Sequence, residues 1–255
     1  MIKILPVLFA TVLIFVTLPA TATNSYSDDY VEAEGVVYPE GQSLNAMRRI
    51  AIMDAYRYLS ERIDTIYVSS NSTVKNLRDL DDAINAKVET ALRGATVVSV
   101  NRESDGSFHA IVRLYKHGSP NSLASAVLRE DVRVEDFPAP KFTNIVSASY
   151  TGLIIDCRGK NLSEAIAPAI KSVDGTEIYA YRNLGYQTTI SMGMIGYSTS
   201  MDSGVERAGS LPLVIKAVSI SSECDVVVNA DDADKILTAN QSTHFLNNCA
   251  VVFVR

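Results

Sequence analysis

Apolar side chains recur at helical spacing between residues 44 and 63, while several arginines fall on the other side of the same turn pattern. Ser43 stands where a helix cap is expected. The preceding residues 31–38 alternate apolar and polar side chains and end at Pro39-Glu40-Gly41, which is typical of a strand followed by a turn. The pattern therefore predicts a strand and then a long amphipathic helix.

The next pattern predicts a second amphipathic helix, from about Asn76 to Gly94, and a β-hairpin over 95–101 and 108–115 with Asp105-Gly106 at its turn. The helix stripe consists of Leu77, Leu80, Ile84, Val88 and Leu92. A short extended piece is expected near residues 65–68. Residues 28–117 are thus predicted to form an α+β domain, in which two helices cover one face of a small antiparallel sheet.

Residues 118–149 differ in composition, with Pro120, Pro138 and Pro140, and they predict a linker lying against the surface, with a short helix near 121–129. Residues 150–255 predict a second, sheet-rich α+β domain. Its candidate strands are 153–157, 169–173 paired with 177–181, 190–197, 213–220, 225–229 and 250–254, and its one predicted helix covers 230–239.

The first 22 residues have the pattern of a signal peptide. Lys3 gives a positive start, residues 4–18 are mostly apolar, and Pro19-Ala20-Thr21-Ala22 suits cleavage after Ala22. The alternative is an uncleaved anchor, although the apolar run is short for a bilayer. We expect a periplasmic or secreted protein without a membrane span after cleavage; outer-membrane association stays open.

The composition of the chain disfavours two classes of binding protein and limits the number of disulfides. The chain has 29 acidic and 23 basic residues, a net charge of −6, which disfavours a general nucleic-acid binder. It contains no Trp, which disfavours an aromatic stacking platform. Three cysteines allow at most one internal disulfide, and Cys224 with Cys249 is the preferred pair; three buried thiols, including Cys157, are the alternative.

Sequence patterns typical of catalysis are missing from the chain. His109, His117 and His244 do not have zinc-site spacing, and neither a nucleophile elbow nor a phosphate-binding loop occurs. The acidic run at 231–234 after Asn229 is typical of a helix start rather than of a calcium loop. We therefore predict no catalytic residues, no metal and no cofactor.

A family resemblance rests on Glu32-Ala33-Glu34-Gly35, the Arg-rich helix 46–59 and the hairpin ending in Val112-Arg113-Leu114. These segments resemble the LPP-twenty lipoprotein family, which overlaps with the N-terminal domain of the flagellar assembly protein FlgT and with FlgP-type outer-membrane proteins. The resemblance covers about residues 31–115. It implies an extracytoplasmic, non-catalytic protein of envelope or appendage assembly, often oligomeric. This chain lacks the acylated cysteine of the lipoproteins.

Arg48, Arg49 and Arg57 are the candidate interaction surface, either for an acidic partner or for a neighbouring copy; a solvated helix face is the alternative. The leading hypothesis is an exported structural or assembly protein that contacts envelope or appendage proteins and forms homo-oligomers through sheet edges or the Arg-rich helix. A periplasmic ligand-binding module for a cell-wall or surface molecule is the main rival, and an unrecognised hydrolase is a third.

Overall fold

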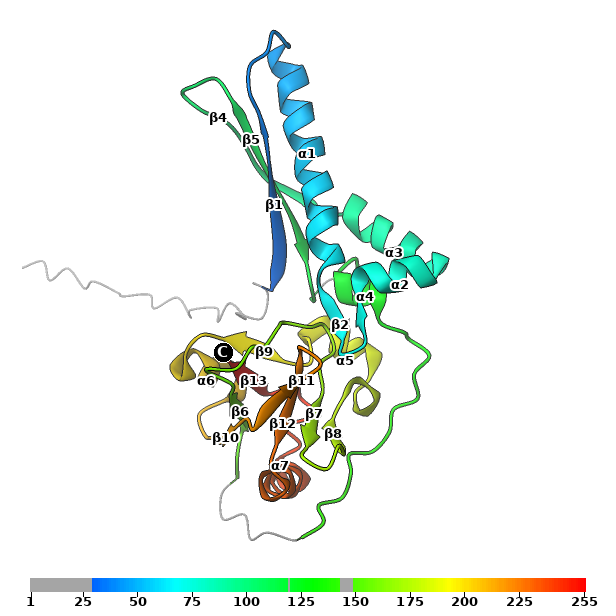
Figure 1. Cartoon of the computed structure of the whole chain (residues 1–255), viewed down its shortest axis with the longest axis vertical. Helices are drawn as coiled ribbons and strands as arrows, with labels where there is room; N and C mark the ends of the chain where they lie inside the picture. The colour runs from blue at the N-terminus through cyan, green and yellow to red at the C-terminus, as the bar shows by residue number, and fades with distance from the viewer. Residues whose placement is uncertain (1–28, 119, 143–148) are drawn as a thin grey trace, which may run out of the picture.

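The computed structural model describes residues 29–118, 120–142 and 149–255. The predicted signal peptide lies outside these residues. The chain forms an elongated arm and a rounder C-terminal part, with the arm projecting away from it (Figure 1). We call residues 29–118 and 120–128, which form the arm and the helices at its base, the blade, and residues 150–255 the body.

The blade contains a three-stranded antiparallel sheet in the order β1-β5-β4. Strand β1 (Tyr30–Val37) pairs along its whole length with β5 (Phe108–Tyr115), and β4 (Thr96–Arg102) forms the predicted hairpin with β5. The long helix α1 (Leu44–Asp64) lies along one face of this sheet (Figure 1). As predicted, Ser43 caps it, its hydroxyl accepting a hydrogen bond from the backbone N–H of Ala46.

Small residues let β1 and α1 approach closely. The buried stripe of α1 recurs every four residues, at Met47, Ala51, Ala55, Leu59 and Ile63. A Cβ added to Gly35 would lie 2.1 Å from the carbonyl oxygen of Ala51, so only glycine fits there.

The second predicted helix is divided into α2 (Val74–Leu80) and α3 (Asp82–Arg93), so the prediction of one continuous helix was wrong. Asp81 is extended between them, and its carboxylate accepts hydrogen bonds from the N–H groups of Ala83 and Ile84. This side chain caps a new helix and thereby competes with continuation of the first. Leu80, assigned to the apolar stripe, is instead 83% exposed.

Helices α2 and α3 lie beside the lower end of α1, so α1 provides most of the cover over the sheet (Figure 1). The short hairpin of β2 (Tyr67–Ser69) and β3 (Ser72–Thr73) leads into α2. Helix α4 (Leu123–Val127) forms within the predicted linker, and its apolar side chains are buried in the blade's core, because the Ser122 cap starts a helix whose residues are nearly all apolar.

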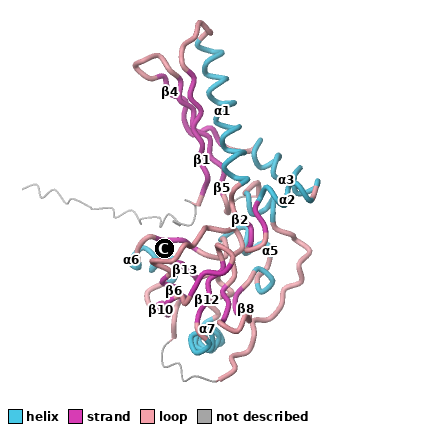
Figure 2. Tube along the Cα trace, in the orientation of Figure 1, coloured by secondary structure: helices cyan, strands magenta, loops and turns pink. Residues whose placement is uncertain are grey.

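Within the described part of the predicted linker, residues 129–142 are exposed or half-buried. Residues 129–142 run as an extended segment beside the body (Figure 2). Hydrogen bonds tie this segment down: Glu135 N–H donates to the Arg182 carbonyl, and the amide of Asn183 donates to the Asp136 carbonyl.

The described part of the body contains two four-stranded sheets, of order β10-β6-β13-β9 and β11-β12-β7-β8. The first is parallel throughout, and the second is mixed. In chain order the elements are β6 (Gly152–Asp156), β7 (Ile170–Ser172), β8 (Glu177–Tyr179), α5 (Tyr186–Met192), β9 (Gly196–Ser198), α6 (Met201–Ala208), β10 (Pro212–Lys216), β11 (Ser219–Ser221), β12 (Asp225–Val228), α7 (Ala230–Thr243) and β13 (Val251–Val254).

Burial on both faces explains the continuous apolar runs of the parallel sheet. Ile154 and Val252 pack under α6 on one face. Leu153, Ile155 and Phe253 point to the other face, where they share a core with the second sheet and α7.

Two strand predictions in the body were wrong. Residues 190–197 form the end of α5 and then β9, because Gly193, at φ +70°, ends the helix between them. Residues 213–220 form two strands, β10 and β11, that belong to different sheets. Helix α6 was not predicted. The fold class, α+β with a small antiparallel sheet followed by a sheet-rich part, is confirmed.

Candidate functional site: the junction of blade and body

A cleft of about 480 Å³ separates the base of the blade from the body. Its blade wall is made by the start of β1 and the residues that follow β5, and its body wall by the edge strand β9 and helix α6. The residues that carry polar or charged groups into it include Asp29, Lys116, His117, Glu164 and Arg207. None of these was singled out by the sequence as a site.

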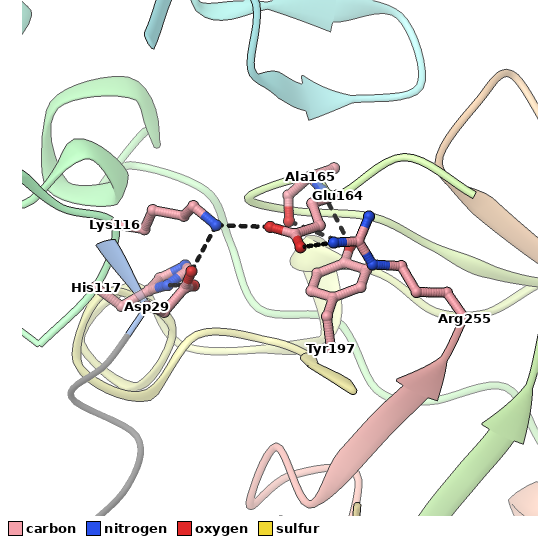
Figure 3. A network of polar contacts seen from close by, with 7 residues as sticks. All are labelled: Asp29, Lys116, His117, Glu164, Ala165, Tyr197 and Arg255. Atoms are coloured by element: carbon pink, nitrogen blue, oxygen red, sulfur yellow. Dashed lines mark hydrogen bonds and ion pairs between the residues drawn. The ribbon is translucent and has the colours of Figure 1, made fainter. Parts of the chain in front are cut away.

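A chain of ion pairs crosses the cleft (Figure 3). The Lys116 Nζ lies 2.6 Å from Asp29 Oδ1 on the blade and 2.7 Å from Glu164 Oε2 on the body. Glu164 also pairs with Arg255, which directly follows β13. Only 13% of the Lys116 side chain is exposed, so its ammonium group depends on these two carboxylates.

His117 completes the network from the blade side. Its Nδ1 lies 3.0 Å from Asp29 Oδ2, and its ring packs against Gly193, where an added Cβ would come within 3.1 Å. Burial opposes ionisation of Asp29, but hydrogen bonding by His117 and the charge of Lys116 outweigh it and lower the pKa of this carboxyl. Burial likewise opposes the charge of Lys116, yet Asp29 and Glu164 raise its pKa.

Main-chain bonds reinforce the junction. The N–H groups of Ile166 and Ala167 donate to the carbonyls of Tyr67 and Val68 in β2, at 2.9 and 2.7 Å. Within the body, the Tyr197 hydroxyl accepts a hydrogen bond from Ala165 N–H at 3.0 Å, next to the junction residue Glu164. Ile166 and Ile190 of the body are also buried within the blade's apolar core. The junction therefore holds blade and body together by charge, backbone bonding and apolar packing.

Arg207 lines the cleft, but its guanidinium is bonded to backbone carbonyls of the body. Its Nε and Nη2 donate to the carbonyls of Cys249 and Gly193, at 2.7 and 2.6 Å. Gly196 leaves room for it, because an added Cβ would lie 2.8 Å from Arg207 Cδ. This guanidinium ties α6 to the loops before β9 and β13.

The predicted disulfide is not formed in this structure. Cys157, Cys224 and Cys249 are free thiols and all are buried, as in the alternative interpretation. Burial raises the pKa of both Cys157 and Cys224 to about 12, so neither is a thiolate at neutral pH. Cys224 precedes the buried Asp225 at the start of β12, whereas Cys249 lies before β13 in the other sheet.

The three candidate arginines of α1 differ in their contacts. Arg57 lies 2.9 Å from Glu61 and 3.7 Å from Asp54, and it stacks over the Tyr58 ring at 4.0 Å. Arg48 and Arg49 are exposed and form no ion pair with any residue that the structure describes. The structure thus places Arg57 in a local network and leaves the other two directed to solvent.

The other residues considered for chemistry also have structural partners. His109 Nδ1 lies 2.6 Å from Glu34 across β1 and β5, and His244 ends α7 in a left-handed conformation. Asn229, which precedes the acidic run, caps α7 as predicted. Asp234 is buried and accepts hydrogen bonds from Lys141 and Phe142 N–H, a role the sequence did not indicate.

Among the described residues, no group of three His, Cys, Asp or Glu side chains is placed to hold a metal ion. Within the same residues, no helix is both long and apolar enough to cross a membrane. The junction's acids and bases are bonded to one another, an arrangement that suits fixing two parts in one geometry.

Residues 152–255 match a family model described as the second domain of Treponema pallidum Tp0624. The match begins at β6 and covers nearly the whole body. A search of curated proteins found no match to this chain. The body is thus similar to that domain.

Proposed function

We propose that this chain is an exported, non-enzymatic structural or assembly protein of the bacterial cell envelope or of a surface appendage, and that it acts through protein–protein contacts. The observation that carries the proposal is the junction, where Asp29, Lys116, Glu164 and Arg255 bind one another and thereby fix the blade on the body. A fixed, projecting blade is suited to presenting a surface to a partner.

The surface of the blade supports this function. The outer side of α1 exposes 70% of Met53, which lies one helical turn after Arg49. Arg48 and Arg49 are exposed and form no ion pair with the residues that the structure describes. Methionine and arginine side chains are both enriched at contact surfaces. The signal-peptide pattern and the resemblance of residues 31–115 to the LPP-twenty family give the proposed location: the periplasm or the exterior, with outer-membrane association included.

Photo-cross-linking in intact cells tests the proposal. A cross-linking amino acid at Met53 should capture envelope or appendage proteins in discrete bands. The matched control is the same amino acid at Val173, 55% exposed but on the body, which should capture fewer. Arg48→Glu with Arg49→Glu should reduce the bands obtained from Met53. Bands at neither position, from a protein found only in the culture medium, would contradict an assembly role.

The cleft favours a second function, a periplasmic module that binds a cell-wall or surface molecule. Its 480 Å³ would admit a small polymer fragment, and Met192, 38% exposed, offers an apolar contact beside the ionic wall. Co-sedimentation of the purified protein with isolated peptidoglycan tests it. Retention that Met192→Lys abolishes would support the module, whereas a protein that stays in the supernatant would remove a cell-wall ligand.

A further inference from the structure

The two edge strands of the blade sheet, β1 and β4, differ in whether side chains bond to their main chain. At the β1 edge, Arg62 Nη1 donates to the Glu32 carbonyl at 2.7 Å, so a side chain occupies part of the main chain that another strand would need. At the β4 edge, no side chain in the part of the chain that the structure describes bonds to the main chain of residues 96–102; Tyr56 reaches only Ala95. The β4 edge is therefore open to strand pairing.

The side chains of β4 are also incompletely covered. Val97 and Val100 pair with Val112 and Ala110, which are fully buried, so they point to the α1 side of the sheet. Helix α1 lies over β1 and β5, however, and Val97 and Val98 remain 37% and 45% exposed (Figure 1). We call Val97, Val98 and Val100 the β4 strip.

The composition of β4 suits pairing with its own twin. The strand has no proline, and its one charged residue is Arg102, at the end of the strand. In an antiparallel pair with a two-fold axis at Val100, Ser99 faces Asn101 of the other copy and Val98 faces Arg102. The two Arg102 residues then stand four positions apart, about 13 Å along the strands. Like charges do not oppose each other, and each copy covers the strip that the other leaves open.

The irregularity of β4 leaves this pairing intact. The register with β5 shifts between Val97 and Ser99, which places the bulge at Val98. Residues 99–102 keep regular pairing with β5, and this regular stretch contains Val100, the position of the two-fold axis. From these observations we infer that two copies of this protein join through β4 into one continuous six-stranded antiparallel sheet. The inference rests on the proposed function and names one partner of the blade, a second copy.

Light scattering coupled to size exclusion tests the pairing. The full mature protein should be a dimer that dissociates on dilution. Val98→Lys should give a monomer. Pairing would then place two lysines, one from each copy, among the apolar side chains of the β4 strips. The control is Val214→Lys, an exposed valine on the edge strand β10 of the body, which should remain dimeric. A protein that is monomeric at every concentration, or a dimer that Val98→Lys leaves intact, would overturn the inference.

Disulfide cross-linking tests the register in a folded protein. The double variant Ser99→Cys with Asn101→Cys should form a covalent dimer on oxidation, because those positions face each other. Each single variant should remain uncross-linked, because equal residues are then two positions out of register and too far apart for a disulfide. The native thiols are buried and do not interfere. If dimerisation fails but Met53 still captures envelope proteins, the β4 inference is wrong and the proposed function stands.

Discussion

The Nζ of Lys116 lies 2.7 Å from Glu164 Oε2, although 48 residues separate the two and they come from blade and body respectively. The contact is partly shielded, with 13% of the lysine side chain and 31% of the glutamate exposed. An ion pair so placed contributes more than one at the open surface, where solvent and salt weaken the attraction.

Removing the charge of Lys116 should therefore destabilise the folded protein. Lys116→Met leaves Asp29 and Glu164 without their shared cation and should lower the free energy of unfolding by about 2 kcal/mol, less than for a fully buried pair because both carboxylates reach water. Urea unfolding followed by circular dichroism measures it. Arg129→Gln, which breaks an exposed pair with Asp131, is the control and should leave the midpoint unchanged. Equal midpoints for both variants would show that the junction is not held by this charge.

The junction should also weaken in acid. Because the pKa of Asp29 is lower in the folded protein than its usual 3.8, its contribution is complete above that value and is lost as the pH falls through the folded pKa. Asp29→Asn should remove this component, so the stability of the variant should fall less steeply than that of the wild type below pH 3.8. Urea midpoints across acidic pH values measure the slope, and identical slopes would contradict the assignment.

Gly35 should tolerate no side chain. Gly35→Ala places a methyl group against the backbone of α1, near Ala51 and Ala55, and should cost about 3 kcal/mol or more because a helix backbone cannot move aside like a flexible side chain. The control is Gly185→Ala, whose new methyl group has its nearest neighbour at 3.9 Å. Thermal unfolding should show a large fall in Tm for the first variant and a small change for the second. A small fall at Gly35 would mean that β1 and α1 can separate easily.

The cysteines should be inaccessible and reduced. In the native protein a thiol-reactive dye should label none of them, because all three are buried and burial raises their pKa. After unfolding in denaturant without reductant, three thiols should react. Labelling of one thiol only would instead indicate the disulfide between Cys224 and Cys249 that the sequence suggested.

Local sequence patterns predicted much of the blade. The four-residue recurrence of small and apolar side chains in α1 identified its buried face, and Asp105-Gly106 marked the hairpin, because both signals act between neighbours in the chain. The pattern was misleading at Asp81, where a capping side chain overrode a regular stripe. It was also misleading at residues 190–197, where Gly193 separates a helix from a strand that pairs with β13.

The sequence by itself determined the α+β class, the extent of α1 and the hairpin, and the lack of catalytic sequence motifs, because these follow from side-chain periodicity and residue spacing. Only the tertiary structure brought Asp29, Lys116, Glu164 and Arg255 into one network, since each is an isolated charge with no informative neighbour. It alone also shows that the three cysteines are free, buried thiols and that β4 is an edge strand of the blade sheet. Contacts of this kind depend on how distant strands pack, which no local pattern encodes.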